Sequence, residues 1–330
     1  MKPTSVLRTL RLLRGYLMRP HGVNPNVIES RFFRTNERYA TIVYSPPHRV
    51  GKTVVLIHGV SGRASDDPSL VHLARNLCVL GYRVVTPALA QLAQFRHSLS
   101  DVDAAAQGIA YAAELAQSKI GVFSFSYGAS FALCAAAHPI ARKCCSGVVG
   151  FGAYYQLADA LEHQRKLLIQ CPDLSQDDAD LAYLRYTLLA SHRDEISLSE
   201  DAWAEIEPIL INYTTRTPIE VKRAPLLKHT RHIDYVDLMQ RYQARTLPDT
   251  LSPRAVVSNI LCPVGLLHDP ADRFVPANQS ELIATKLNER PSVARTLVLT
   301  TPMLSHVQVD PRRNLRDFPK LVNLLDIVLG

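Results

Sequence analysis

The sequence of 330 residues lacks the patterns by which several classes of protein are recognised. Gly-rich phosphate loops, Cys-x-x-Cys pairs and His-Glu-x-x-His motifs are absent, so neither a nucleotide site nor a metal site is predicted, and no cofactor is expected. No stretch approaches the ~18 consecutive apolar residues of a membrane-spanning helix. Because 47% of the residues are hydrophobic, we expect a soluble globular protein with a sizeable core.

Cysteine is also scarce, with six residues in the whole chain. Cys144 and Cys145 are adjacent, but no second pair is present with which they could bind a metal ion. The other four lie in apolar sequence contexts: Cys78, Cys134, Cys171 and Cys262. They are expected to be buried thiols, which is typical of a reducing compartment and predicts a cytoplasmic location.

Acidic residues are nearly missing from the start of the chain, and this accounts for most of the net charge of +7. Residues 1–35 hold seven Lys or Arg and a single acid, Glu29, which leaves 30 basic and 29 acidic residues for the remainder. The remainder is close to neutral and shows no extended basic patch with interleaved aromatics. Nucleic-acid binding is therefore not expected.

The basic segment, residues 1–22, has the periodicity of an amphipathic helix that is closed by Pro20 and Gly22. Its apolar residues recur at helical spacing and its arginines lie broadly opposite; the two sets are Val6, Leu10, Leu13 and Leu17, and Arg8, Arg11 and Arg19. One interpretation is a helix packed on the body of the protein with its arginines in water. The alternatives are peripheral contact with an anionic membrane surface and an organelle-targeting segment.

Strand patterns and helix patterns alternate over much of the chain, which predicts an α/β fold with a mainly parallel central sheet flanked by helices. Strands are expected at about 28–34, 39–45, 53–58, 82–87, 119–124, 146–151, 264–268 and 295–300, and helices at about 67–80, 100–117, 127–138, 277–288 and 313–329. The first two strands have no helix between them, so that edge of the sheet should be antiparallel.

The alternation stops between residues 153 and 252, where the pattern is helical and rich in charge. Helices are expected at Ala153–Gln170, Gln176–Ser191, Ser199–Tyr213 and Ile233–Thr246. This pattern predicts a core formed by residues 23–152 and 253–330, with a helical segment, residues 153–252, inserted into it. The acid-rich stretch Asp173–Asp180 is interpreted as a solvated loop and helix start rather than a cation site.

The segment Ile120–Ser130 is an apolar strand that runs into a tight turn and a helix, with Ser126 at the turn. Strand and helix pack closely at such a turn, and the residues two positions to either side of Ser126 are small, Ser124 and Gly128. Ser126 is therefore predicted to be a nucleophile. Ser124 competes for this role, but the β-branched Val122 lies two positions before it and fits a tight turn poorly.

Two later strand ends carry residues that could complete a catalytic triad with Ser126. The seventh expected strand leads into a loop that holds Asp269 and Asp272, and the eighth leads into a loop that holds His306. A serine hydroxyl is almost never ionised at neutral pH, so it needs a base, and His306 is the candidate. The chain order is then Ser, Asp, His.

These features together resemble the α/β-hydrolase superfamily, over roughly residues 27–155 and 253–330. The segment Lys52–Val60 resembles the third strand of the family and its His-Gly turn, although the His-Gly-Gly-Gly run of many lipases and esterases is not present. Ser124 stands where the family usually has the first glycine of its nucleophile elbow. The helical segment 153–252 resembles the cap that many family members carry over the active site.

The resemblance also implies roles for particular residues. In this family the turn after the third strand and the residue after the nucleophile supply an oxyanion hole, which here implies the amides of Val60 and Tyr127. The family places its acid shortly before a Val-Pro pair, which favours Asp272 over Asp269. Asp269 would then be a turn-forming side chain that binds local amides.

The expected activity is hydrolysis of a carboxylic ester or of a thioester through an acyl-enzyme on Ser126, and a lipophilic ester is the natural substrate if the basic helix binds a membrane. Asp272 would orient His306, and His58 would brace the His-Gly turn, while His268 is a candidate pocket residue. An acyltransferase with the same triad is the first alternative, and carbon–carbon bond hydrolysis is another chemistry open to the fold. A non-catalytic binding protein on a hydrolase scaffold is the alternative from a different class.

Overall fold

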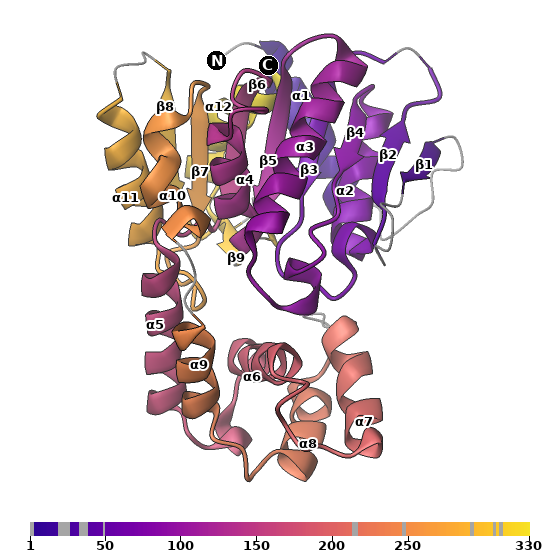
Figure 1. The fold of residues 1–330 in the computed structure, drawn as a ribbon. Helices are drawn as coiled ribbons and strands as arrows, with labels where there is room; N and C mark the ends of the chain where they lie inside the picture. The colour runs from indigo at the N-terminus through magenta and orange to yellow at the C-terminus, as the bar shows by residue number, and fades with distance from the viewer. Residues whose placement is uncertain are drawn as a thin grey trace.

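An eight-stranded sheet runs through the centre of the computed structural model (Figure 1), which describes residues 3–18, 27–32, 39–48, 50–212, 217–245, 249–290, 294–305, 308–309 and 313–330. The strands are β1 (Ile28–Phe32), β2 (Thr41–Ser45), β3 (Thr53–Ile57), β4 (Arg83–Thr86), β5 (Ile120–Phe125), β6 (Cys145–Phe151), β7 (Val264–His268) and β8 (Thr296–Thr300). Their order across the sheet is β1-β2-β4-β3-β5-β6-β7-β8. A separate short ladder pairs β9 (Leu304–Ser305) with β10 (Gln308–Val309).

The directions of the strands agree with the sequence-based prediction. β2 pairs antiparallel with β1 and with β4, whereas the pairs from β4 to β8 are all parallel. Parallel strands are normally covered by helices on both faces, and every residue of β3 and of β7 is buried. β5 lies between β3 and β6, so the residue that follows β5 emerges near the middle of the sheet.

Helices cover both faces of the sheet (Figure 1). One face shares an apolar core with α1 (Pro3–Met18), α2 (Pro68–Val79) and α12 (Phe318–Leu329), and the other with α3 (Leu99–Ala116), α4 (Tyr127–Ala137) and α11 (Asn278–Asn288). The helix expected from residue 313 begins only at Phe318, because a 3-10 turn precedes it. Within the described ranges, no helix has both the length and the apolar character needed to cross a bilayer.

The N-terminal helix α1 packs against α2 and α12, through a face that is rotated from the one that the sequence pattern predicts. Among the side chains of α1 that the structure describes, Ser5, Thr9, Leu12 and Leu13 are buried. Of the expected stripe, Leu13 is therefore buried, whereas Leu10 is 48% exposed. Apolar periodicity alone therefore gave the wrong rotation for this helix.

Polar contacts with α12 set the rotation of α1. The hydroxyl of Ser5 donates to Asp326 Oδ1 at 2.7 Å, and the guanidinium of Arg8 donates to the carbonyl of Leu329. A cation at the C-terminal end of a helix is favoured by the helix dipole. The packed-helix interpretation of residues 1–22 thus holds for the described part of that segment, except that Arg8 is bound to α12 and does not lie free in water.

A helical insertion separates β6 from β7 and lies below the sheet in Figure 1. Its helices are α5 (Leu157–Gln170), α6 (Ala179–Ser191), α7 (Glu200–Ile211), α8 (Ile219–His229) and α9 (Tyr235–Ala244), and the short α10 (Pro253–Val256) follows at the edge of the core. α5 and α9 lie side by side and join the other three helices to the sheet. No strand interrupts the insertion in its described residues.

Of the helices in the insertion, α8 is the one that the sequence pattern does not indicate. Pro225 lies in its interior, where proline removes a backbone hydrogen bond and normally breaks a helix. The helix forms because Leu226 is fully buried and because the hydroxyl of Tyr186 on α6 donates to the carbonyl of Lys222 at 2.6 Å. Tertiary packing therefore outweighs local propensity here.

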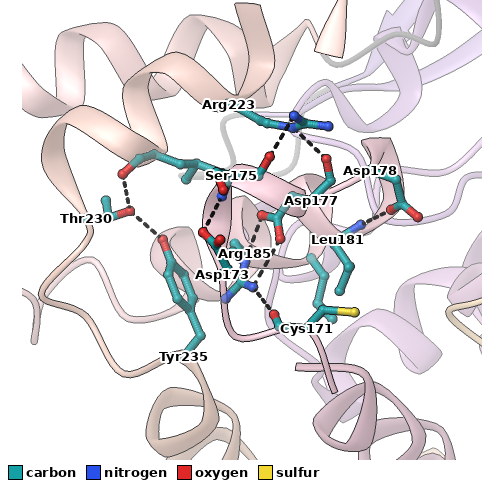
Figure 2. A network of polar contacts seen from close by, with 12 residues as sticks. Cys171, Asp173, Ser175, Asp177, Asp178, Leu181, Arg185, Arg223, Thr230 and Tyr235 are labelled. Carbon is teal, nitrogen blue, oxygen red and sulfur yellow. Dashed lines mark hydrogen bonds and ion pairs between the residues drawn. The ribbon is translucent and has the colours of Figure 1, made fainter. Parts of the chain in front are cut away.

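A buried ion pair lies at the centre of the insertion (Figure 2). Arg185 on α6 donates to both carboxylate oxygens of Asp177, at 2.8 and 3.1 Å, and neither side chain is more than 3% exposed. Arg185 also donates to the carbonyl of Cys171 at 2.5 Å. Arg223 on α8 donates to the carbonyls of Asp177 and Ser175. Arg185 on α6 and Arg223 on α8 thus both bind the loop that connects α5 to α6.

This arrangement corrects the prediction of a solvated loop over Asp173–Asp180. The prediction is wrong for Asp177, which is buried because Arg185 neutralises it. It is right in kind for Asp173 and Asp178, whose carboxylates accept hydrogen bonds from amides two and three residues further along and so begin the next helical segments.

We expect Arg185→Leu to lower the free energy of unfolding by about 3–5 kcal/mol, because it leaves the carboxylate of Asp177 buried without a counter-charge. Urea denaturation measures the change. The matched control is Arg241→Leu, which removes exposed ion pairs with Asp237 and Glu195 and should cost about 1 kcal/mol or less. Equal effects of the two substitutions would contradict a structural role for the buried pair.

Candidate active site

Ser126 occupies the single residue between the end of β5 and the start of α4, and its backbone is strained. Its φ is 52° and its ψ is −133°, a combination that residues with a side chain rarely adopt. The amide of Ser126 donates to the carbonyl of Phe151 on the neighbouring strand at 2.6 Å, which fixes the turn. The side chain itself is largely buried, with 7% of the residue exposed. This is the backbone geometry expected of a nucleophile elbow.

The two small residues beside the turn, Ser124 and Gly128, have different structural roles. A Cβ added at Gly128 would lie 1.9 Å from the carbonyl oxygen of His58, so no larger residue fits there. Ser124 is fully buried in β5, and its hydroxyl donates to the carbonyl of Val149 at 3.2 Å. Ser124 therefore contributes a hydrogen bond within the sheet, and its backbone lacks the positive φ of Ser126.

The loop after β3 passes directly against Ser126. A Cβ added at Gly59 would lie 3.0 Å from the Cβ of Ser126 and 3.0 Å from the carbonyl oxygen of Phe125. Gly59 is therefore required by the close approach of the two turns. The next residue is Val60, so the predicted oxyanion donor is adjacent in sequence to this contact.

His58 fixes the peptide unit that carries the Val60 amide. The amide of Leu89 donates to Nε2 of His58 at 3.0 Å, so the ring proton lies on Nδ1, which donates to the carbonyl of Gly59 at 2.7 Å. In a planar trans peptide the C=O and N–H point in opposite directions. Holding the Gly59 carbonyl toward His58 therefore turns the N–H of Val60 away from it. The expected bracing role of His58 is confirmed.

The second predicted donor, the amide of Tyr127, is fixed in the same way. The carbonyl of Ser126 accepts a hydrogen bond from the amide of Ala129 at 2.8 Å, which orients the peptide between Ser126 and Tyr127. Among the residues that the structure describes, neither the Val60 amide nor the Tyr127 amide has a hydrogen-bond acceptor. Both N–H groups can thus donate to a bound oxygen atom.

Asp272 lies in the loop after β7, with its side chain fully buried. Its Oδ1 accepts hydrogen bonds from the amides of Phe274 and Val275 at 2.8 and 3.0 Å. Two backbone donors of this kind stabilise the ionised carboxylate. Asp269 instead accepts from the amide of Ala271 at 2.9 Å and shapes the turn, as expected.

The loop that carries Asp272 is held from beneath by His268, whose side chain is fully buried. Ring nitrogen Nε2 donates to the carbonyl of Val275 at 2.9 Å and lies 3.7 Å from Oδ2 of Asp272. Nδ1 is then free of hydrogen and accepts from the hydroxyl of Ser280 at 2.6 Å. His268 is therefore a bracing residue of the loop rather than a pocket residue.

Gly152 shows how near the acid and the nucleophile are. Its φ is +68°, and a Cβ added to it would lie 3.4 Å from Oδ2 of Asp272 and 3.9 Å from Cα of Ser126. The structure thus brings Ser126, Asp272 and the two candidate amides into one region at the ends of β3, β5, β6 and β7. His306 lies outside the described residues, and its role as base stays a prediction.

Sequence reasoning missed the histidines that the fold places near these residues. His163 lies on α5. Burial lowers the pKa of His163, and the negative charge of the nearby Asp272 partly opposes this shift. The ring of His97 lies on that of Tyr127, with centroids 4.8 Å apart, and burial lowers the pKa of His97 to about 3. Neither histidine lies in a motif, so only their positions in the fold identify them.

His58 makes folding stability depend on pH. Burial lowers its pKa in the folded protein, whereas an unfolded histidine titrates near ~6.5. Below that pH the unfolded chain binds a proton at this histidine, whereas the folded chain does not. The free energy of unfolding therefore falls by up to about 1.4 kcal/mol for each unit by which the pH is lowered, until the pKa of the folded protein is reached. Above ~6.5 the contribution is constant.

We therefore expect His58→Gln to flatten the decline in the free energy of unfolding between about pH 6.5 and pH 5, as measured by urea denaturation. His232→Gln is the matched control, because His232 is exposed and stays in water on folding. An unchanged slope in His58→Gln would show that His58 is protonated in the folded protein.

Proteins of known structure share the fold of this chain. No protein-family model matches the sequence, and no curated protein matches it significantly. An esterase from Pyrococcus furiosus is similar in structure, with a TM-score of 0.54 and 13% identity over 92% of each chain. An acylaminoacyl peptidase from Pyrococcus horikoshii has a TM-score of 0.51 and 13% identity, over 91% of this chain and 41% of the peptidase. This chain therefore spans about two fifths of the length of that peptidase.

A third similar structure is that of a 2,6-dihydroxy-pseudo-oxynicotine hydrolase, with a TM-score of 0.50 and 16% identity, over 93% of this chain and 69% of that one. At these identities the likeness concerns the fold alone. The eight-stranded, mainly parallel sheet, the strained serine after its fifth strand and these similar structures agree: the chain has the α/β-hydrolase fold.

Proposed function

We propose that the protein is a serine hydrolase that cleaves a carboxylic ester or a thioester through an acyl-enzyme. The observation that carries the proposal is the strained backbone of Ser126, which lies against the Gly59 turn and near the buried carboxylate of Asp272. The esterase and peptidase of similar fold support acyl-group chemistry by analogy.

The proposed reaction begins when His306 takes the proton of the Ser126 hydroxyl as its oxygen attacks the substrate carbonyl carbon. The carbonyl oxygen becomes an oxyanion that accepts hydrogen bonds from the Val60 and Tyr127 amides. Asp272 stabilises the imidazolium form of His306. His306 then protonates the leaving alcohol or thiol. A water molecule next gives a proton to His306 and attacks the acyl carbon, and His306 returns that proton to the Ser126 oxygen as the acyl–oxygen bond breaks and the acid leaves.

We propose further that the helical insertion acts as a cap. Gln164 on α5 binds Tyr127, which follows Ser126, and Tyr183 on α6 binds Val60, which follows Gly59. This placement supports a role of the insertion in excluding water and selecting the substrate. An acyltransferase would use the same residues with an alcohol or amine in place of water. Product analysis with a competing alcohol separates the two, because a transferase forms the new ester in preference to the free acid.

The nucleophile is tested by labelling the purified protein with a fluorophosphonate probe and locating the modified peptide by mass spectrometry. We expect labelling at Ser126 and a fall on the order of 10^4 or more in esterase activity for Ser126→Ala and for His306→Ala. Ser124→Ala is the matched control, since it removes a buried hydroxyl two residues away and should keep the label.

Labelling that survives Ser126→Ala would assign the nucleophile elsewhere and contradict the proposal. Retention of label in His306→Ala together with its loss in His163→Ala would move the role of base to α5. A folded protein that no probe modifies would favour the non-catalytic alternative.

We also propose that the solvent face of α1 contacts anionic membrane surfaces. Leu7 and Leu10 are 51% and 48% exposed, and the exposed Arg11 and Arg14 lie on the same face at helical spacing. Exposed leucines beside arginines suit the boundary between acyl chains and anionic headgroups. The buried Leu12 and Leu13 make deletion of the helix an unsuitable test, because deletion would expose the core.

The double variant Leu7→Glu/Leu10→Glu is therefore expected to lose co-sedimentation with phosphatidylserine vesicles while its unfolding midpoint stays unchanged. Leu282→Glu is the matched control, because it places the same charge at an exposed leucine on α11. Equal binding of the double variant and the wild type would refute a membrane role for this face.

A further inference from the structure

The helical insertion contacts both of the residues whose amides are the proposed oxyanion donors. From α5, the side-chain amide of Gln164 donates to the hydroxyl of Tyr127 at 2.5 Å. From α6, the hydroxyl of Tyr183 donates to the carbonyl of Val60 at 3.0 Å. Two separate helices of the insertion thus hold the two sides of one site.

Gln164 has a second contact that reaches the acid loop. It is 4% exposed, and its side-chain nitrogen also donates to the carbonyl of Phe274 at 3.0 Å. A carbonyl can only accept, so the nitrogen and not the oxygen of the Gln164 amide faces this pair of groups. The amide of Phe274 is one of the two donors to Asp272. One buried side chain therefore links the residue after the nucleophile with the loop of the acid.

Phe274 is also the point where the two helices meet the acid loop. The ring of Tyr183 meets that of Phe274 edge to face, with centroids 6.0 Å apart and planes at 89°. The loop after β3 has a further contact with the insertion: Asn212, which follows α7, accepts a hydrogen bond from Arg63 in that loop. The loop after β3 is thus tied to the insertion at Val60 and again at Arg63.

Tyr127 transmits its contact through a ring that has little freedom to move. The residue is 5% exposed, and its ring packs on those of His97 and Tyr154, with centroids 4.8 and 5.2 Å away. A hydrogen bond at the end of a ring clamped in this way restrains the start of α4. Gln164 therefore acts on the position of the Tyr127 backbone and not only on its hydroxyl.

We propose that Gln164 and Tyr183 are positioning residues that restrain the Val60 and Tyr127 amides from the side of the insertion. The inference rests on the proposed function, because it assigns those amides to the oxyanion. The core already orients the two peptides, through His58 for Val60 and through the Ala129 amide for Tyr127. Each of the two insertion side chains holds a second group beside one amide, so the donors keep catalytic geometry best when the insertion is seated on the core.

The kinetic test uses p-nitrophenyl acetate as substrate. Loss of one complete oxyanion donor costs about 10^2–10^3 in kcat, and a donor that is loosened rather than lost should cost less. We expect Tyr183→Phe and Gln164→Leu each to lower kcat about tenfold while KM changes less than twofold, because the contact matters in the transition state. Tyr183→Phe keeps the ring against Phe274 and removes only the hydroxyl.

Tyr186→Phe is the matched control for Tyr183→Phe. Tyr186 is on the same helix and also donates to a carbonyl, that of Lys222, but this contact lies within the insertion. It should lower stability by a similar amount and leave kcat unchanged. An equal fall of kcat in Tyr186→Phe would show a general effect of stability and overturn the proposal, as would unchanged kcat in Tyr183→Phe and Gln164→Leu.

A double-mutant cycle decides whether Gln164 acts through Tyr127. Tyr127→Phe removes the acceptor hydroxyl and should lower kcat as Gln164→Leu does. In the Tyr127→Phe background, Gln164→Leu should then have little further effect, since their shared contact is already lost. Effects that multiply in full would mean that Gln164 acts on another group.

A measurement without substrate keeps this inference separate from the proposed function. The 15N-relaxation order parameters of the Val60 and Tyr127 amides, which report the mobility of each N–H vector, should fall in Tyr183→Phe and Gln164→Leu, respectively, and stay unchanged in Tyr186→Phe. A wild-type protein without Ser126-dependent turnover would refute the hydrolase proposal and the catalytic part of this one. Unchanged order parameters at both amides would refute the positioning role whether or not the protein is an enzyme.

Discussion

The positive φ of Ser126 persists because the chain around it leaves that residue no room to relax. On one side Gly59 lies so close that any Cβ there would press on the Cβ of Ser126, and on the other Gly128 lies against the carbonyl of His58. The bond from the Ser126 amide to Phe151 ties the turn to the next strand. Strain of this kind costs about 1–3 kcal/mol and survives only where its surroundings determine it. The rest of the site is built on the close packing of these two turns.

The same packing explains why, among the residues that the structure describes, the Val60 and Tyr127 amides have no acceptor. Buried N–H groups in native proteins are nearly always hydrogen-bonded, so a pair left open needs a cause. Here the cause is that the opposite ends of both peptides are occupied. The Gly59 carbonyl is bound by His58, and the Ser126 carbonyl is bound by the amide of Ala129. Neither N–H can turn to find a partner without breaking one of those bonds.

Most of the core could be predicted from the sequence because its signals are local. The strand pattern of Ile120–Ser130, the small residues around Ser126 and the carboxylate loop after β7 are each visible within about a dozen residues. The features that were missed depend on contacts that the sequence pattern does not show. The face of α1 is set by Asp326, which is 321 residues from Ser5. Asp177 is buried by its ion pair with Arg185, which is only eight residues away but carries no motif that marks it as the partner.

Gln164 and Tyr183 belong to this second kind. In the sequence each is an ordinary residue of a charged helix, with no motif around it. Their partners are 37 residues away for Gln164 and 123 residues away for Tyr183. The partner of Tyr183 is a backbone carbonyl, which any residue type offers, and the partner of Gln164 is the hydroxyl of one of thirteen tyrosines. Only the placement of the insertion against the core distinguishes them from their neighbours.

Burial around Tyr127 has an electrostatic consequence that unites these observations. It raises the pKa of the Tyr127 hydroxyl, and the nearby carboxylate of Asp272 raises it further, so the phenol stays neutral at physiological pH. Burial also keeps His97 neutral, because its pKa is about 3. The Tyr127 and His97 side chains on this side of Ser126 are therefore uncharged. In the proposed reaction, a negative charge that develops on a substrate oxygen would meet the oriented Val60 and Tyr127 N–H groups beside these buried, neutral rings, and preoriented donors stabilise a charge most where the surroundings are of low polarity.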